Sequence, residues 1–232
     1  MTPASRKRRR LVLACVAGFF VVLAGWAALD LFGHSTRSLR DFNPSEVARL
    51  DTAMWRSYYA KQRIPLFFQL TELLRKEYHL PWLRSQWVAY QAAKAAFVFK
   101  EGRNRNDYEK ALPYLRGFYS AISASSDEPF DINRAAEFEL EWWIVHRERE
   151  KHSPEDLPKL LAQTSAVMYH MPYEPLLEHG KLRAEAMQIR DNQAPAGGVT
   201  EQDWTQIGSL LNKSWRSLWQ AVNANKPVGS RP

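Results

Sequence analysis

The sequence predicts an all-α protein in which one N-terminal transmembrane helix precedes a helical bundle, or stacked helical hairpins, of about seven to eight helices. Three observations lead to this fold class. An apolar run follows a basic cluster at the N-terminus. Downstream, apolar residues recur at spacings of three and four, the period of a helix face packed against a core. No stretch of useful length alternates between apolar and polar residues, as a half-buried strand would.

The N-terminal segment consists of a basic region at residues 1–10 and an apolar region at residues 11–32. The apolar region, LVLACVAGFFVVLAGWAALDLF, is long enough to cross a hydrocarbon core of about 30 Å as a helix. Basic residues are retained on the cytoplasmic side of a membrane. The topology signal is therefore the cluster of Arg6, Lys7, Arg8, Arg9 and Arg10. It predicts a signal-anchor in the cell (inner) membrane, a cytoplasmic N-terminus and a periplasmic or extracellular body.

Two other interpretations of this segment also export the body. In the first it is a cleaved signal peptide, because Gly25 and Ala27 are small residues that can form a cleavage site ahead of Ala28. In the second, Cys15 carries a lipid, although only four apolar residues precede it and the apolar run continues well beyond it. Cys15 is the only cysteine in the chain, so the exported domain forms no internal disulfide and no thiolate zinc site.

After the apolar run, the sequence predicts a short polar tether at residues 33–43, an all-α domain at residues 44–224 and a flexible C-terminal tail at residues 225–232. Asn43 is expected to cap the first helix of the domain, because Pro44 suits the first helical position. Prolines and polar turn residues separate the helices that follow. These signals predict helices at residues 44–58, 66–78, 82–100, 106–122, 131–151, 153–171, 174–191 and 200–224.

Three of these helices have features of their own. Pro113 is expected to kink the helix at residues 106–122, and the stretch NDYEKALPYLRGFY within it resembles the second helix of a tetratricopeptide hairpin. No 34-residue period accompanies that half-repeat. Ser153 with the proline after it is expected to start the sixth helix. Thr200 and Asp203 form a capping-box-like start to the last helix, whose expected core face is Trp204, Ile207, Leu211, Trp215, Leu218 and Val222.

The stretch EFELEWWIVHRERE at residues 137–150 is the candidate functional segment. Because Trp142 and Trp143 differ in direction by about 100° on a helix, they are expected to enter two packing layers of a central helix. Glu139 and His146 lie on a narrow stripe between the apolar faces, and they are the weak catalytic candidates. A buried carboxylate or imidazole must be paired or change its protonation state, and such groups collect at functional sites. We favour the other interpretation, in which both residues bond to neighbouring helices and fix how those helices pack.

Several function classes are disfavoured by composition and by missing motifs. The net charge of +7 comes mostly from the basic cluster: removing its five residues from the 32 Lys and Arg leaves 27, against 25 Asp and Glu. Without the basic cluster the chain is almost neutral, so it lacks the excess positive charge with which proteins bind the phosphates of nucleic acid. The chain contains no Glu-x-x-His pair, zinc-protease motif, GxSxG, GxGxxG or P-loop. We therefore expect no metal, no cofactor and no nucleic-acid partner.

The function expected from the sequence is that of a membrane-anchored extracytoplasmic helical domain acting in protein binding or scaffolding. Its expected partners are membrane lipid, through residues 11–32, and another membrane or periplasmic protein. The alternative is a helical enzyme or ligand-binding protein with a buried polar pocket around Glu139 and His146.

Overall fold

The computed structural model describes residues 3–33, 36–193 and 198–224, with side chains from Arg10 onward. These residues form α1 (Pro3–Phe32), α2 (Pro44–Tyr59), α3 (Arg63–Tyr78), α4 (Trp82–Glu101), α5 (Arg105–Glu109), α6 (Leu112–Ser123), α7 (Ile132–Arg147), α8 (Asp156–Met168), α9 (Leu177–Gln193) and α10 (Glu201–Asn223), with 3-10 turns at Arg149–Lys151 and Glu174–Leu176. Within them the only β-type pairing is a single parallel bridge between Arg37 and Ser126. The predicted all-α class is confirmed.

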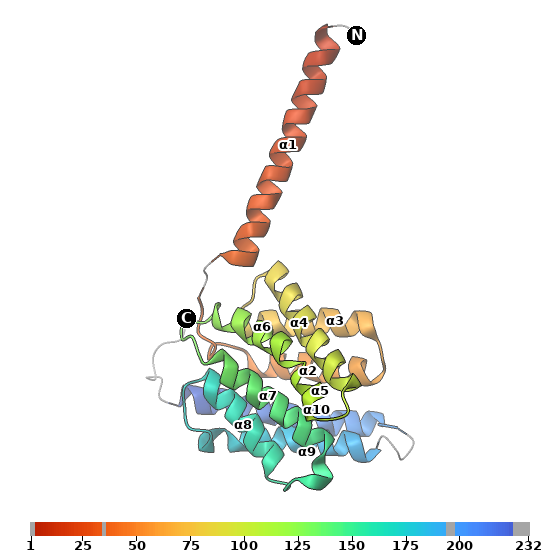
Figure 1. Cartoon of the computed structure of the whole chain (residues 1–232), viewed down its shortest axis with the longest axis vertical. Coiled ribbons are helices and arrows are strands. Elements are labelled where there is room, and N and C mark those ends of the chain that lie inside the picture. Colours follow the sequence, from red (N-terminus) through yellow and green to blue (C-terminus); the bar gives the residue numbers. More distant parts are fainter. Residues whose placement is uncertain (1–2, 34–35, 194–197, 225–232) are drawn as a thin grey trace.

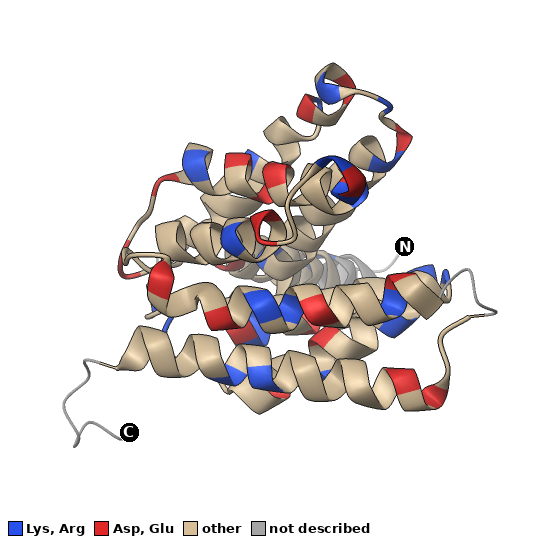
Figure 2. Cartoon of the chain, turned by 90° about the horizontal axis from the view of Figure 1, so that it is seen from below, with Lys and Arg blue, Asp and Glu red and all other residues tan. Residues whose placement is uncertain are grey.

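The helices of the body pack in the order of the chain. α2 contacts α3, α3 contacts α4, and the series continues through α6, α7, α8 and α9 to α10, which returns to pack on α2. The short α5 contacts α4 and α7. The body is therefore a helical bundle whose last helix closes against its first, and α1 stands away from it (Figure 1). Basic and acidic residues are interspersed along the body helices (Figure 2).

Two apolar clusters fill the bundle. The larger includes Leu74, Leu140 and Leu176, each almost fully buried, and draws on helices from α2 to α10. The smaller lies among α2, α8, α9 and α10 and includes Ile207 and Leu211. All six residues predicted for the core face of the last helix are buried, which confirms that face.

Predicted helix starts are confirmed where a side chain caps the helix. The Asn43 side chain accepts hydrogen bonds from the backbone N–H groups of Ser45 and Glu46, at 3.0 and 3.1 Å. Thr200 and Asp203 form a complete capping box at the start of α10. At the sixth helix the prediction is early, since α8 begins at Asp156 and the Ser153 hydroxyl accepts from the Glu155 N–H in the turn before it.

The helix predicted at residues 106–122 is broken rather than kinked. α5 ends at Glu109, and α6 begins at Leu112 with Pro113 in its first turn. Pro113 has no N–H to donate to the carbonyl of Glu109, and its ring would clash with that carbonyl in a continuous helix. The sequence therefore located the disruption correctly but underestimated its extent.

The segment assigned to a polar tether instead belongs to the body from residue 36 onward. Leu39 and Phe42 are buried in the larger cluster. The Arg40 guanidinium donates to the carbonyl oxygens of Val222, at 2.8 Å, and Tyr169, at 2.6 Å. The sequence analysis did not predict these contacts because Leu39 and Phe42 are isolated apolar residues in a segment that is otherwise mostly polar. The tail predicted at residues 225–232 lies outside the described residues.

The end of α1 is joined to the start of α4 by reciprocal caps. The Asp30 carboxylate accepts hydrogen bonds from the backbone N–H groups of Leu83, at 2.8 Å, and Arg84, at 3.2 Å. The buried Arg84 side chain donates in turn to the carbonyls of Leu31, at 3.1 Å, and Gly33, at 2.7 Å. A carboxylate thus meets the positive end of α4 and a guanidinium the negative end of α1. Four hydrogen bonds thus connect the end of α1 to the body at the start of α4.

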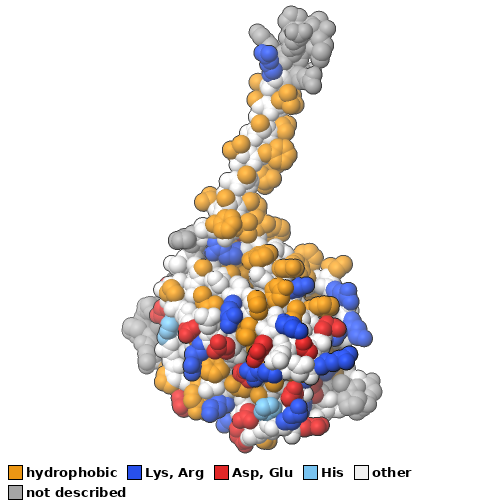
Figure 3. All heavy atoms as spheres, viewed as in Figure 1, with side chains coloured by type: hydrophobic (Ala, Val, Ile, Leu, Met, Phe, Trp, Pro, Cys, Tyr) orange, Lys and Arg blue, Asp and Glu red, His pale blue; other side chains and the backbone are white. Residues whose placement is uncertain are grey.

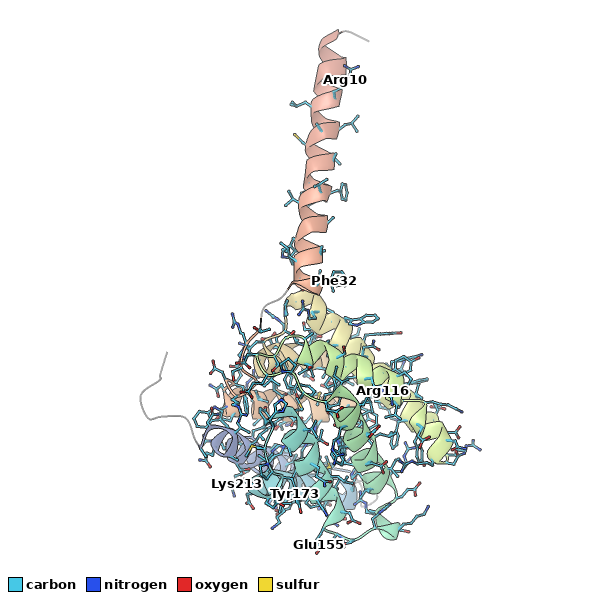
Figure 4. The ribbon with its side chains drawn as sticks, turned by 60° about the vertical axis from the view of Figure 1, so that its left-hand side comes forward. Arg10, Phe32, Arg116, Glu155, Tyr173 and Lys213 are labelled. Carbon is cyan, nitrogen blue, oxygen red and sulfur yellow. The ribbon has the colours of Figure 1, made fainter. Side chains whose placement is uncertain are left out.

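α1 is a helix long and apolar enough to cross a membrane between Arg10 and Phe32. None of this stretch is buried against the rest of the chain. Away from its junction with α4, its side chains point outward with no other element beside them (Figure 4). A long apolar helix that nothing covers needs an apolar environment from elsewhere.

Candidate functional site

Glu139 binds three neutral donors. Its carboxylate accepts hydrogen bonds from the indole N–H groups of Trp142, at 2.8 Å, and Trp143, at 3.0 Å, and from the Tyr119 hydroxyl, at 2.9 Å. Burial raises the pKa of Glu139, while the bonds from Trp142, Tyr119 and Trp143 and the charge of Arg183 oppose that rise. The carboxylate therefore connects α7 to α6 and holds both indoles in place.

His146 belongs to a different network, two helical turns further along α7. Its Nε2 lies 2.9 Å from a carboxylate oxygen of Asp191 on α9, and the same oxygen accepts from Arg149. The second oxygen of Asp191 accepts from Arg190 at 2.9 Å. Burial works to raise the pKa of Asp191, but the hydrogen bonds from His146, Arg190 and Arg149 outweigh it and lower that pKa well below its usual range.

The structure does not bring Glu139 and His146 into one site. They share no hydrogen-bond partner, and neither borders the two best-defined surface hollows. One hollow lies beside His170, in the turn that follows α8, and the other between Asn43, His79 and Trp219. Both candidates bond to neighbouring helices, which is the structural role that the sequence analysis favoured.

The two tryptophans of the segment separate as predicted. Trp143 packs against the larger apolar cluster and Trp142 against the smaller one, with their rings edge to face at a centroid distance of 6.0 Å. Both side chains are only half-buried. Helix α7 therefore lies between the two clusters. Part of each tryptophan side chain remains exposed to solvent, so each contributes less to the core than a fully buried tryptophan would.

We expect Trp142→Ala and Trp143→Ala each to lower the free energy of unfolding by about 1 to 3 kcal/mol, below the roughly 3 to 5 kcal/mol lost when a buried Trp is truncated. Glu139→Gln should cost about 1 to 2 kcal/mol, because its amide N–H₂ replaces an acceptor facing N–H donors. Denaturant melts of the full chain measure each loss. A near-native melt for both tryptophan variants would contradict the position of α7 between the clusters.

A buried ion pair that the sequence analysis missed lies between α2 and α9. Asp51 is 1% exposed, and one of its carboxylate oxygens accepts from Arg183 at 2.5 Å and from the Trp215 indole at 2.9 Å. The other oxygen is buried without a hydrogen-bond partner. The Arg183 guanidinium lies against the rings of Trp55, at 5.4 Å, and Trp215, at 5.8 Å. The sequence signal available was an aspartate between Leu50 and Trp55 on an otherwise apolar helix face.

Glu77 on α3 is a second buried carboxylate that the sequence analysis passed over. It is 4% exposed. Burial raises its pKa to about 8, and the charges of Asp51 and Glu139 act in the same direction, whereas the Tyr78 hydroxyl and Arg183 oppose them. Glu77, Asp51 and Glu139 thus interact with the single guanidinium of Arg183. Holding a proton on Glu77 reduces the repulsion among the carboxylates.

We expect the unfolding free energy of the full chain to fall as pH rises from 6.5 to 8. Native Glu77 retains its proton up to about pH 8, whereas the unfolded chain releases it near pH 4.5, so the native state holds more protons in this range. The slope can approach about 1.4 kcal/mol per pH unit. His179 titrates in the opposite sense, since burial lowers its pKa from 6.5 to about 4. Its opposing contribution fades as pH rises through 6.5, where the unfolded histidine loses its proton, so Glu77 dominates the upper part of the range.

Glu77→Gln should remove that slope and raise the melting temperature at pH 8, because the amide is neutral at every pH. Glu185→Gln, an exposed position on α9, is the matched control and should leave the slope unchanged. Equal slopes for the wild type and Glu77→Gln would rule out a neutral Glu77.

His179 and Ser214 form a buried pair with no access to substrate. The Ser214 hydroxyl lies 2.8 Å from Nδ1 of His179 and 2.9 Å from its carbonyl oxygen, and both residues are almost fully buried. A nucleophilic serine must reach solvent or a cavity to meet a substrate. The pair therefore connects α9 to α10 rather than forming a catalytic dyad. Within the described part of the chain, no group of three or more His, Cys, Asp and Glu is arranged to hold a metal ion.

The exposed feature that stands out is one face of α4. Trp87, Tyr90 and Phe97 are 52%, 48% and 60% exposed, and they lie with Lys94 at spacings of three and four. Trp87 and Tyr90 stack at a centroid distance of 5.6 Å. We call these four residues the aromatic face of α4. Hydrophobic side chains also gather over α3 and α4, beside the base of α1 (Figure 3).

Comparison with known protein families, with curated proteins and with solved structures gave no match. The class of the protein is therefore defined by its own fold: an all-α bundle preceded by one exposed apolar helix that is long enough to span a membrane.

Proposed function

We propose that this chain is a single-pass membrane protein with a cytoplasmic N-terminus, whose body lies in the periplasm or outside the cell and acts in protein binding or scaffolding. The observation that carries the proposal is the exposure of the apolar stretch of α1 up to its junction with α4. At 1.5 Å per residue, residues 11–32 extend about 33 Å, which matches a hydrocarbon core of about 30 Å.

The basic cluster at residues 6–10 supports this orientation, because Lys and Arg beside a span are retained on the cytoplasmic side. Of these five side chains, only that of Arg10 falls within the described residues, where it is exposed at the start of the apolar stretch. Trp26, 47% exposed near the other end, suits the opposite membrane interface.

The junction between α1 and α4 supports a scaffolding role. The bonds made by Asp30 and Arg84 leave little freedom at the point where the chain enters the body. A body held in one direction at the membrane surface presents the same face to a partner throughout. An anchor that served only to localise an enzyme would not need such a fixed direction.

Binding is favoured over catalysis by the position of the titratable groups. Asp51, Glu77 and His179 are enclosed in the core, and Glu139 bonds only to aromatic donors of the protein. The alternative, an enzyme or ligand-binding protein with a pocket around Glu139 and His146, requires a shared cavity, and their separate networks give it no support.

The test is crosslinking of the tagged full-length protein in intact cells, followed by purification from the membrane. A defined partner should be recovered with the wild type. It should be lost from a Phe19→Arg/Val22→Arg variant, because each arginine at the centre of a span costs about 2.5 to 3.5 kcal/mol of insertion. Phe19→Leu/Val22→Leu is the matched control. Recovery of no partner, together with turnover of a small molecule by the purified protein, would contradict the proposal.

A further inference from the structure

We propose that the part of the aromatic face of α4 nearest to α1, Trp87 and Tyr90, docks on the lipid headgroup region of the membrane that α1 spans. This inference rests on the proposed membrane anchoring and names what covers this exposed aromatic surface of the body. Three observations carry it: the depth at which α4 begins, the chemistry of its outer face, and the absence of acidic residues along nearly all of the helix.

The reciprocal caps set the depth of α4. Asp30 lies two residues before the end of the apolar stretch, at the outer end of the proposed span. Because its carboxylate accepts from the N–H groups of Leu83 and Arg84, the first turn of α4 lies at that same depth. Trp82, the first residue of α4, is 49% exposed there. The helix therefore starts at the boundary between hydrocarbon and headgroups and runs from there away from α1 (Figure 1). Trp87 and Tyr90 lie in its first half, within about 12 Å of its start along the axis.

The composition of the outer face suits this environment. Trp and Tyr are enriched at membrane interfaces, where an apolar ring with one polar atom is stable at the level of the headgroups. The opposite side of α4, including Val88 and Ala89, is fully buried in the body, so the aromatic face is its free side. A soluble protein rarely exposes several adjacent aromatic residues unless a partner or a membrane covers them.

The charge of α4 is complementary to an anionic membrane. Its solvent-accessible basic residues are Lys94 and Lys100, since Arg84 is buried in the junction with α1, and its one acidic residue is Glu101, the last residue of the helix. Lys94 lies within the aromatic face, 6.0 Å from the ring centroids of Phe97 and Tyr114. Basic residues close to a membrane surface are attracted by anionic lipids, and this attraction ends within a Debye length. A lipid surface therefore fits the face better than a protein surface rich in Lys and Arg.

The experiment uses the full chain in vesicles of phosphatidylcholine and phosphatidylglycerol that carry a spin label on the lipid headgroup. A Cys15→Ser/Tyr90→Cys variant holds an environment-sensitive fluorophore on the aromatic face. Its emission should shift to the blue and be quenched by the labelled headgroups. The same fluorophore at Cys15→Ser/Glu185→Cys, exposed on α9 at the end of the body remote from α1 (Figure 1), should show neither effect.

A second variant tests the face without disturbing the fold. Adding Trp87→Ser and Lys94→Glu to the Tyr90 probe should abolish its quenching, because Trp87 is exposed and Lys94 is half-buried, and neither side chain belongs to the buried core. Vesicles of phosphatidylcholine alone should give weaker quenching than anionic ones. Unchanged quenching in the Trp87→Ser/Lys94→Glu variant would overturn the proposal.

The native Cys15 separates failure of docking from failure of anchoring. A fluorophore on Cys15, exposed on α1, should be quenched by spin labels within the acyl chains. Quenching at Cys15 with none at Tyr90 overturns the docking and leaves the anchor intact. No quenching at Cys15 overturns the proposed function itself. The emission of the probe at position 90 could instead shift to the blue as the protein-to-lipid ratio rises, without quenching by labelled lipid. That result would overturn docking on lipid and show that a second copy of the chain covers the face.

Discussion

Asp51→Asn is expected to lower the free energy of unfolding of the full chain by about 3 to 5 kcal/mol, the usual cost of removing one partner from a buried ion pair. Arg183 would keep its positive charge in an environment where its side chain is only 16% exposed. The Trp215 indole would lose its charged acceptor in the same substitution. A loss of this size is a large part of the 5 to 15 kcal/mol that stabilises an ordinary domain.

The double variant Asp51→Asn/Arg183→Met supplies the control. Replacing both charges removes the unpaired guanidinium, so the double variant should be less destabilised than the sum of the two single variants. Guanidinium melts of all four proteins in the same detergent give the coupling energy. Strict additivity would mean that Asp51 and Arg183 do not stabilise one another.

Trp215→Ala is expected to cost about 3 to 5 kcal/mol, the range found when a large buried aromatic residue is truncated. Trp215 is 6% exposed, and its ring packs against those of Phe42 and His179 at centroid distances of 5.9 and 5.6 Å. Its removal leaves a cavity at the point where the segment before α2 meets α9 and α10. It also leaves Asp51 with one hydrogen-bond donor fewer.

Trp215→Phe separates these two effects. Phenylalanine keeps most of the ring contacts and removes the indole N–H, so its cost should be about 1 to 3 kcal/mol. Thermal melts at pH 7 compare the two variants directly. If Trp215→Phe were as destabilised as Trp215→Ala, the hydrogen bond to Asp51 rather than packing would account for the whole loss.

The parts of the fold that the sequence predicted are those determined by local signals. Asn43, Thr200 and Asp203 cap their helices through side chains within three residues, and the core face of α10 follows a strict helical period. Such features depend on neighbours in the chain alone. The separation of Trp142 and Trp143 into two clusters follows from the same geometry, since 100° per residue holds in any α-helix.

What the sequence did not show depends on pairs far apart in the chain. Asp51 and Arg183 are 132 positions apart, and Asp30 reaches α4 across more than 50. Neither residue carries a local mark that distinguishes a buried charge from a solvated one. The aromatic face of α4 was overlooked for the opposite reason. Its residues fit the expected periodicity of a core helix, and only the packing of α3 and α6 shows which side is free.

The orientation of the chain in the membrane is the central claim, and a reporter fused after Pro232 tests it most directly. Both the binding role and the docking of α4 require the body to lie on the side opposite the basic cluster of residues 6–10. Alkaline phosphatase, which folds only after export, should be active in this fusion, and the activity should remain in the membrane fraction. A fluorescent protein that matures only in the cytoplasm should stay dark at the same position. Bright fluorescence with inactive phosphatase would place the body in the cytoplasm and contradict the account.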